Sequence, residues 1–345
     1  MSEKKHLPVP VRFNKENLVR TTSVVGRGQF AISYILGKIE LDNGNHSFKR
    51  RHKSPPILIK SVNMNDNERC FKALRREINI LEDLRPQRHI LNLIGACTTD
   101  IRNRNLDLVF EFCGNGNLLK FMRHCNPSSE FEFDSIRSTV THTESGPVLT
   151  LTRYRLLQWC YEIAAGMTYL ASKQICHNDL SARNILVTFQ WNTKICNFAL
   201  AQKQQGQINQ PPPHNLPTSV LPLKWMAPEA IRHLKYSEKS DVWSFGVVMW
   251  EICSLGDVPY RDWVVDADFW KTLSKSQRLQ KPRFATVDMS AIMTLCWEYM
   301  PDNRPNFSQV AKSLKRLIKL KEKHGRNDGN NRAVNIHHLR TMSSQ

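Results

Sequence analysis

Several short segments of this chain carry residue types that take part in phosphoryl transfer. In chain order they are the turn Gly26-Arg27-Gly28, Lys60 after an apolar run, Glu77 in a helical pattern, Asp179 and Asn184 in a polar loop, and Asn197-Phe198-Ala199. Glycine-rich turns and lysine hold phosphates, and carboxylate and amide oxygens hold Mg²⁺. The pattern predicts a site built for metal-assisted phosphoryl transfer.

Asn197 lacks the negative charge that metal-assisted phosphoryl transfer requires. It stands thirteen residues after Asn184. The resemblance of these motifs to protein kinases, described below, implies that this position should carry an anionic oxygen, which holds Mg²⁺ against the ATP phosphates. An amide has nearly the same shape as a carboxylate but carries no charge. The turn Gly26-Arg27-Gly28 is a weak signal by itself. The specificity of the whole set comes from its order and spacing.

The elements that must position these residues change character near Gly114. Residues from about Leu18 to Cys113 contain β-like runs such as Ile57-Leu58-Ile59, and Glu68 to Leu84 has the apolar spacing of one helix. After Gly114 the pattern is helical. We therefore expect an α+β fold with a small β-rich N-lobe carrying one long helix and a larger, mainly helical C-lobe.

The C-lobe is expected to contain a helix at Asn117–Cys125 and three longer helices. The first of these three has the apolar stripe Leu156, Cys160, Ile163, Met167 and Leu170, and the second is capped by Ser240 or Asp241. The third runs from about Phe307 to Lys323. Its expected outer face carries the basic residues Lys312, Lys315, Arg316, Lys319 and Lys323.

Composition narrows the class of protein. The 345 residues are 41% hydrophobic and 23% charged, which is ordinary for a globular protein, but the net charge is +18. Such a charge suggests an anionic partner such as acidic phospholipid, nucleic acid or an acidic protein segment, although solvated basic helix faces explain it as well. The nine scattered cysteines indicate reduced thiols, not zinc or disulfides. With neither a signal peptide nor an apolar span expected, we predict a cytoplasmic location, with membrane association as an option.

The combined motifs resemble the protein kinase superfamily over roughly residues 18 to 323. The loop His177-Asn178-Asp179-Leu180-Ser181-Ala182-Arg183-Asn184 and the segment Leu221 to Glu229 are similar to tyrosine kinases. Ile90 to Cys97, Gly166 to Ala171 and the insert after Cys125 resemble receptor kinases of the fibroblast and platelet-derived growth factor receptor type.

The resemblance implies a division of the chain. The expected parts are an N-terminal tail at 1–17, an N-lobe at 18–113, a C-lobe at 114–323 with a flexible insert at 126–148 and an activation segment at 197–229, and a disordered basic tail at 324–345.

It also implies roles for individual residues and two cofactors, ATP and Mg²⁺. Lys60, oriented by Glu77, would contact the α- and β-phosphates, and Asp179 would be the base. Arg183 matches the tyrosine-kinase loop arginine, and Asn184 and Asn197 match the two metal positions. Asn178 replaces an arginine that many kinases use to bind an activation-loop phosphate, and residues 202–221 contain no tyrosine. Regulation by tyrosine phosphorylation there is not expected.

The implied nucleotide pocket departs from the family pattern. Its positions are Gly26, Gly28, Phe30, Ser33, Leu58, Lys60, Phe110, Glu111, Cys113 and Leu186. Leu58 stands where the family has alanine and adds three carbons, which costs about 1–3 kcal/mol if a tight site must absorb them. Ser33 replaces valine, Ala31 replaces the third glycine, and Phe110 is the gatekeeper. Together they predict a narrowed or filled pocket.

The residues expected to hold the fold together match the family. They are the interlobe stack Leu81, Leu93, His177 and Phe198, the ion pair of Glu229 with Arg304, and Asp241, which would bind the catalytic-loop backbone. Three functions remain open. The first is a pseudokinase that acts by binding other proteins (kinases, receptors or adaptors), and the second is a slow tyrosine kinase. The third is docking of the basic helix on an anionic membrane or nucleic acid.

Overall fold

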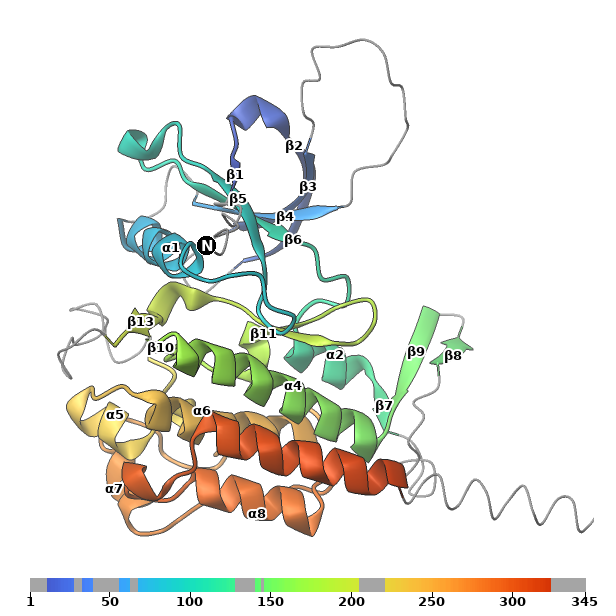
Figure 1. The fold of residues 1–345 in the computed structure, drawn as a ribbon, viewed down its shortest axis with the longest axis vertical. Helices are drawn as coiled ribbons and strands as arrows, with labels where there is room; N and C mark the ends of the chain where they lie inside the picture. Colours follow the sequence, from blue (N-terminus) through green and yellow to red (C-terminus); the bar gives the residue numbers. More distant parts are fainter. Residues whose placement is uncertain are drawn as a thin grey trace, which may run out of the picture.

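A computed structural model describes residues 11–27, 33–39, 56–62, 68–127, 140–143, 146–204 and 221–323. The chain forms two lobes, as expected from the sequence (Figure 1). The upper lobe is a twisted sheet with one long helix beside it, and the lower lobe is a stack of helices. The predicted α+β architecture is confirmed.

The N-lobe is built on a six-stranded sheet with the order β1-β5-β6-β4-β3-β2. The strands are β1 (Val11–Arg12), β2 (Leu18–Arg27), β3 (Ser33–Ile39), β4 (Ile57–Ser61), β5 (Leu93–Cys97) and β6 (Asp107–Glu111). All neighbours are antiparallel except β1 and β5, which run parallel. The sheet therefore begins in β1, ahead of the Leu18 boundary expected from the sequence, and Phe13 is buried beneath it.

Strand β4 contributes side chains to two apolar clusters, one on each face of the sheet. Side chains alternate between the faces of a strand, so Ile57 and Ile59 share one face and Leu58 and Lys60 share the other. Ile57 and Ile59 belong to a small cluster with Phe13 and Val109, whereas Leu58 belongs to the main core that continues into the C-lobe. Lys60 consequently faces the side on which α1 (Glu68–Leu81) lies.

The helix α1 follows from its apolar spacing, with Leu74, Ile78 and Leu81 buried. It ends at Leu81, three residues before the expected Leu84. The predicted insert at 126–148 contains more regular structure than the expected flexible loop. Its described parts belong to a three-stranded sheet, β7-β9-β8, formed by β7 (Asn126–Pro127), β8 (Val140–Thr143) and β9 (Gly146–Leu151).

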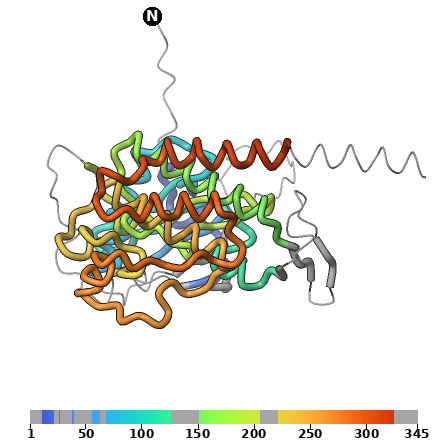
Figure 2. Tube along the Cα trace, turned by 90° about the horizontal axis from the view of Figure 1, so that it is seen from below, coloured from blue at the N-terminus to red at the C-terminus, as the bar shows by residue number. Residues whose placement is uncertain are grey.

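The C-lobe packs its helices around α6. Its labelled helices are α2 (Leu118–His124), α4 (Arg153–Ser172), α5 (Pro228–His233), α6 (Glu238–Cys253), α7 (Phe269–Ser274) and α8 (Val287–Cys296). Residues 307–323 form a further helix, which runs along one edge of the lobe (Figure 2). The predicted stripe of α4, from Leu156 to Leu170, is buried as expected.

The expected cap of α6 was wrong by a few residues. Ser237, not Ser240 or Asp241, is the N-cap, and its hydroxyl accepts from the Ser240 backbone at 3.3 Å. Ser240 returns the contact, because its hydroxyl accepts from the Ser237 backbone N–H at 2.9 Å. This reciprocal arrangement frees the Asp241 carboxylate to point into the lobe.

Two short antiparallel strand pairs border the loops that carry the expected catalytic residues. β10 (Ile175–Cys176) pairs with β13 (Gln202–Lys203), and β11 (Ile185–Val187) pairs with β12 (Thr193–Ile195). An isolated bridge joins Ile195 to Ile90, so the segment after α1 is tied directly to the C-lobe. The loop from His177 to Asn184 lies between these pairs.

Candidate active site

A buried ion pair joins the two elements of the N-lobe that face the site. Lys60 on β4 donates to Glu77 on α1, and both residues are almost fully buried. The second oxygen of Glu77 accepts from the backbone N–H of Phe198 at 3.2 Å. This glutamate therefore joins the sheet, the helix and the start of the activation segment, which keeps α1 close to the cleft.

Asp179, Asn184 and Asn197 come together beneath that pair. The Asn197 side-chain nitrogen lies 3.1 Å from Asn184 Oδ1 and 3.4 Å from Asp179 Oδ2. Its oxygen lies 3.4 Å from the Lys60 ammonium. Asn184 in turn donates to the Asp179 backbone carbonyl at 2.7 Å. The residues predicted from the sequence as catalytic and metal-binding are thus neighbours.

The orientation of the Asn197 amide follows from its partners. An ammonium group only donates hydrogen bonds, so the Asn197 oxygen must face Lys60 and its NH₂ must face the oxygens of Asp179 and Asn184. Asn197 has a left-handed backbone (φ 66°, ψ 72°), a conformation that Asn and Asp adopt more readily than other residues with a Cβ. Asparagine is therefore a residue type suited to this backbone conformation.

The loop that carries Asp179 is held from below by Asp241. Its two carboxylate oxygens accept from the backbone N–H groups of His177 at 2.7 Å and Asn178 at 3.0 Å. Burial raises the pKa of Asp241 to about 7, although both hydrogen bonds act in the opposite direction. His177 donates from Nε2 to the Cys196 carbonyl (3.0 Å), and burial lowers the pKa of its imidazole. The predicted role of Asp241 is confirmed.

The four residues of the predicted interlobe stack are buried in the core or pack against it. Phe198 and His177 meet edge to face with ring centroids 5.2 Å apart, and both are buried. Leu81 is buried in the same core cluster and Leu93 packs against it. The segment at Asn197-Phe198-Ala199 therefore has its phenylalanine turned inward, toward α1.

Arg183 lies against both the candidate base, Asp179, and Trp225 of the segment Leu221 to Glu229, which resembles the peptide platform of tyrosine kinases. Its guanidinium donates to Asp179 Oδ1 at 2.7 Å and stacks over the Trp225 ring at 4.7 Å. Glu251 on α6 supports this contact, accepting from Trp225 Nε1 at 2.8 Å and from the Ala182 N–H at 2.9 Å. Glu251 was not singled out from the sequence, although an acidic residue in the apolar second half of α6 was a usable signal.

The start of the activation segment is fastened without any phosphate. Asn178 donates from its side chain to the Leu200 carbonyl at 3.0 Å. Arg76 on α1, which sequence reasoning did not single out, donates to the Ala199 carbonyl at 2.9 Å. Pairing of β13 with β10 continues the attachment. Thr218 and Ser219, which the sequence leaves as possible phosphorylation sites of the segment, lie outside the described residues.

The described part of the nucleotide pocket borders this cluster. Leu58 and Phe110 are directly paired across β4 and β6 and are both buried in the main core. Leu58 thus lies on the same face as Lys60, where the predicted purine site would be. Cys113 is buried and Leu186 half-buried, and burial raises the pKa of the Cys113 thiol to about 12. Gly26 lies in β2, the Ser33 backbone pairs with Ser61, and Gly28, Phe30 and Ala31 lie outside the described residues.

The side chain of Glu111 contacts Asn92 and Lys194, outside the predicted nucleotide positions. Its carboxylate accepts from the Asn92 backbone N–H and pairs with Lys194 of β12, each at 2.8 Å. These contacts join the end of β6 to the loop before β5 and to the C-lobe. A nucleotide contact by this residue would therefore have to use its main chain.

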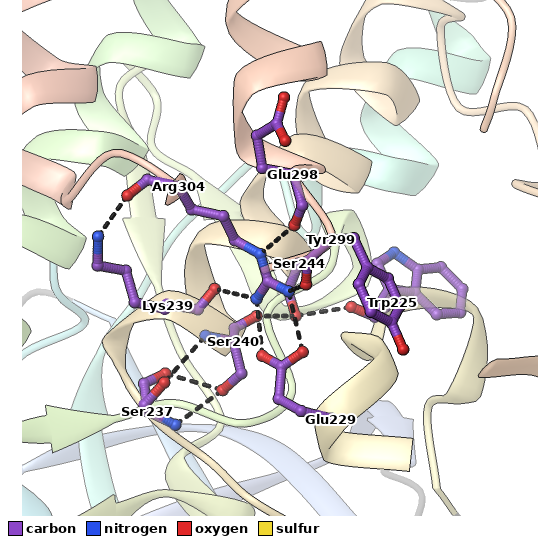
Figure 3. Close-up of polar contacts among 9 residues, drawn as sticks. All are labelled: Trp225, Glu229, Ser237, Lys239, Ser240, Ser244, Glu298, Tyr299 and Arg304. Atoms are coloured by element: carbon purple, nitrogen blue, oxygen red, sulfur yellow. Dashed lines mark hydrogen bonds and ion pairs between the residues drawn. The ribbon is translucent and has the colours of Figure 1, made fainter. Parts of the chain in front are cut away.

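A second buried ion pair anchors the segment below Trp225 (Figure 3). Arg304 donates to both oxygens of Glu229, at 2.7 and 2.9 Å, and is itself almost fully buried. Its remaining N–H groups donate to the carbonyls of Lys239, Glu298 and Tyr299 at 2.7 to 3.0 Å. The predicted pair of Glu229 with Arg304 is confirmed.

The part of the chain that the structure describes lacks a metal-ligand cluster and a membrane-spanning helix. The described residues contain no cluster of three or more His, Cys, Asp or Glu side chains placed to hold a metal ion. Their helices likewise include none with both the length and the apolar character that crossing a bilayer requires.

Comparisons with known proteins agree with the geometry. The family model described as protein tyrosine and serine/threonine kinase matches residues 19–314. A fibroblast growth factor receptor of Strongylocentrotus purpuratus is 35% identical over 271 residues, covering 78% of this chain and 26% of the receptor. Fibroblast growth factor receptor 1 of Xenopus laevis is 34% identical over 297 residues, 86% of this chain and 34% of the receptor.

Vascular endothelial growth factor receptor 1 of Rattus norvegicus is 31% identical, with 89% of this chain and 25% of the receptor covered. The chain thus spans about a quarter to a third of the length of these curated relatives. From the family match, the fold and the cluster around Lys60, Glu77 and Asp179, we conclude that the chain belongs to the protein tyrosine and serine/threonine kinase family, and that its domain is similar to those of receptor tyrosine kinases.

Proposed function

We propose that this tyrosine-kinase-like domain is a pseudokinase, which acts in signalling by binding other proteins and transfers little or no phosphate. The observation that carries the proposal is the position of the Asn197 amide. Its NH₂ group faces the oxygen of Asn184, the other metal position of the family pattern, and the oxygen of the expected base Asp179. Hydrogen-bond donors thus occupy the directions from which a cation would be held.

The donor set at this position is poorly suited to a divalent ion. Mg²⁺ prefers anionic oxygens in a near-octahedral shell, and here both metal positions of the family pattern, Asn184 and Asn197, carry neutral amides. The carboxylate beside them belongs to the expected base, Asp179. Asp179 is moreover paired with Arg183. When present, Mg²⁺ would neutralise charge on the ATP phosphates, and each 1.36 kcal/mol of lost transition-state stabilisation reduces the rate about tenfold.

The shape of the cleft supports the same proposal. Leu58 is buried on the face that also carries Lys60, where the family has alanine. Its three additional carbons lie where a purine ring would pack against the strand, beside the gatekeeper Phe110. ATP would bind only with displacement of these side chains, at a cost of about 1–3 kcal/mol.

The rest of the domain is ordered in the arrangement that a working kinase requires. The pair of Lys60 with Glu77 is closed, Phe198 is turned inward, and Arg304 holds Glu229 beneath the platform. A rigid fold with an impaired catalytic centre is suited to presenting surfaces to kinases, receptors or adaptors. The same contacts favour a second candidate, a slow protein tyrosine kinase that uses Asp179 as its base and holds one metal through Asn184.

The experiment that separates the two candidates is ATP titration with Mg²⁺ and with EDTA, together with a sensitive phosphotransfer assay. For the pseudokinase we expect the ATP affinity of the parent chain to change less than twofold with Mg²⁺. Leu58→Ala should raise ATP affinity by about 5- to 100-fold, because the removed carbons vacate the purine site.

Asp179→Asn is the matched control for catalysis, since it leaves the pocket shape intact. Robust phosphotransfer by the parent chain that disappears in Asp179→Asn would establish the slow kinase and end the pseudokinase proposal. An Asn197→Asp variant that gains turnover only together with Leu58→Ala would show that both departures block catalysis.

A further inference from the structure

The helix at 307–323 carries a continuous cationic face. Its basic residues at that face are all exposed, and they are Lys312, Lys315, Arg316, Lys319 and Lys323. At 3.6 residues per turn these positions fall within an arc of about 100°, and from first to last they extend about 16 Å. We call this surface the basic face.

The opposite side of the helix is fixed to the lobe. Phe307, Val310 and Leu314 are buried, and Leu317 and Ile318 are half-buried against the main core. A helix anchored along one side cannot rotate about its axis. The basic face is therefore held toward the surroundings as a rigid row of charges.

The one acidic residue of the 307–323 helix, Glu322, makes a hydrogen bond to the lobe. Glu322 accepts a hydrogen bond of 2.6 Å from the Tyr154 hydroxyl at the start of α4, which directs its carboxylate toward the lobe. No acidic side chain of the 307–323 helix thus lies within the arc. Leu320, which is 44% exposed, lies next to the basic face and adds an apolar contact at its margin.

We propose that the basic face binds the surface of a membrane that contains anionic lipid. Positive charges in a row on a flat surface match a plane of negative headgroups, and each such charge near the surface strengthens binding about fivefold. Binding of single-stranded nucleic acid is less well supported, because that mode uses aromatic platforms, and the only aromatic residue of this helix, Phe307, is buried.

Docking in this way would leave the candidate active site open. The 307–323 helix lies along the C-lobe, with α4 between it and the N-lobe (Figure 1), and at the lobe's edge (Figure 2). A membrane that contacts the basic face would therefore meet the C-lobe and not the cleft around Lys60 and Asp179. The inference is independent of whether phosphoryl transfer occurs.

The test is sedimentation of the full chain with vesicles of phosphatidylcholine alone and of phosphatidylcholine with 30% phosphatidylserine. We expect binding to the anionic vesicles only, weakening as NaCl is raised from 0.1 to 0.5 M. The triple variant Lys312→Gln, Lys315→Gln and Lys319→Gln should lose about 100-fold in affinity, since each charge contributes about fivefold.

A matched control carries Lys72→Gln, Lys235→Gln and Lys275→Gln, three exposed lysines on other elements, and has the same net charge. It should lose less than tenfold. The proposal would be overturned by an equal loss of vesicle affinity in both triple variants or by equal binding of the parent to neutral vesicles. Tighter binding of an oligonucleotide than of anionic vesicles, through the same three lysines, would also overturn it. Thermal unfolding of both variants checks that they fold.

Discussion

Replacing Asn197 by aspartate should make the stability of the domain depend on Mg²⁺. In the parent chain the amide donates to Asp179 and Asn184 and accepts from Lys60. A carboxylate of the same shape cannot donate, so both hydrogen bonds are lost and two negative groups face each other. A divalent ion is the one small ligand that would relieve this arrangement.

The magnitude follows from the distances. At an effective dielectric constant of 20, two unit charges 3.4 Å apart interact by about 5 kcal/mol. Repulsion from Asp179 and attraction to Lys60 both act at this distance, so the two terms nearly cancel. What remains is the loss of two hydrogen bonds at about 1 kcal/mol each. We expect Asn197→Asp to lose about 2 kcal/mol of unfolding free energy in EDTA, a fall in Tm of about 4 °C.

Mg²⁺ should reverse this loss in the variant and leave the parent chain unchanged. Binding to the folded state alone at a hundred times the dissociation constant would add about 2.7 kcal/mol. The assay is thermal and urea unfolding of both proteins in EDTA and in Mg²⁺, with Asn197→Ala as the control that loses the hydrogen bonds but gains no charge. The reasoning is refuted if the variant is as stable as the parent in EDTA, or if Mg²⁺ stabilises the parent equally.

Two further predictions concern the supports of the site. Burial raises the pKa of Glu251 to about 7, so the folded state holds a proton that the unfolded state releases, and stability from this group is lost as the pH rises from about 4.5 to 7. The Glu251→Gln variant keeps an oxygen that can accept from Trp225 and Ala182 but has no group that titrates. The unfolding free energy of this variant relative to the parent should therefore increase over that pH range, by up to about 3 kcal/mol. A pH-independent difference in urea unfolding would contradict this. Glu229→Ala leaves the buried Arg304 guanidinium without its counter-charge and should cost about 3–5 kcal/mol in urea unfolding, whereas a loss below 1 kcal/mol would show that the backbone carbonyls suffice.

Local patterns predicted the helices and strands that surround the site. The 3.6-residue spacing of apolar residues in α1 and α4 and the apolar run of β4 predict which side chains are buried. Those side chains are buried in the structure. The cap of α6 was misplaced, because Ser237 and Ser240 offer the same side chain within one turn. The strands of the insert and β1 carried no such pattern, and pairing with a partner strand decides their structure.

The sequence alone determined the family of this protein and the identity of its altered residues, Asn197 and Leu58. Both are matters of residue type and spacing along the chain. The tertiary structure decided how the amide at 197 is turned, because that depends on three groups, Lys60, Asp179 and Asn184, which lie 13 to 137 residues from it in the chain. It likewise decided that Glu251 supports Trp225 and that Glu322 turns inward, leaving the basic face uniformly positive. Hydrogen bonds of this kind join residues that are distant in sequence, so only the folded chain defines them.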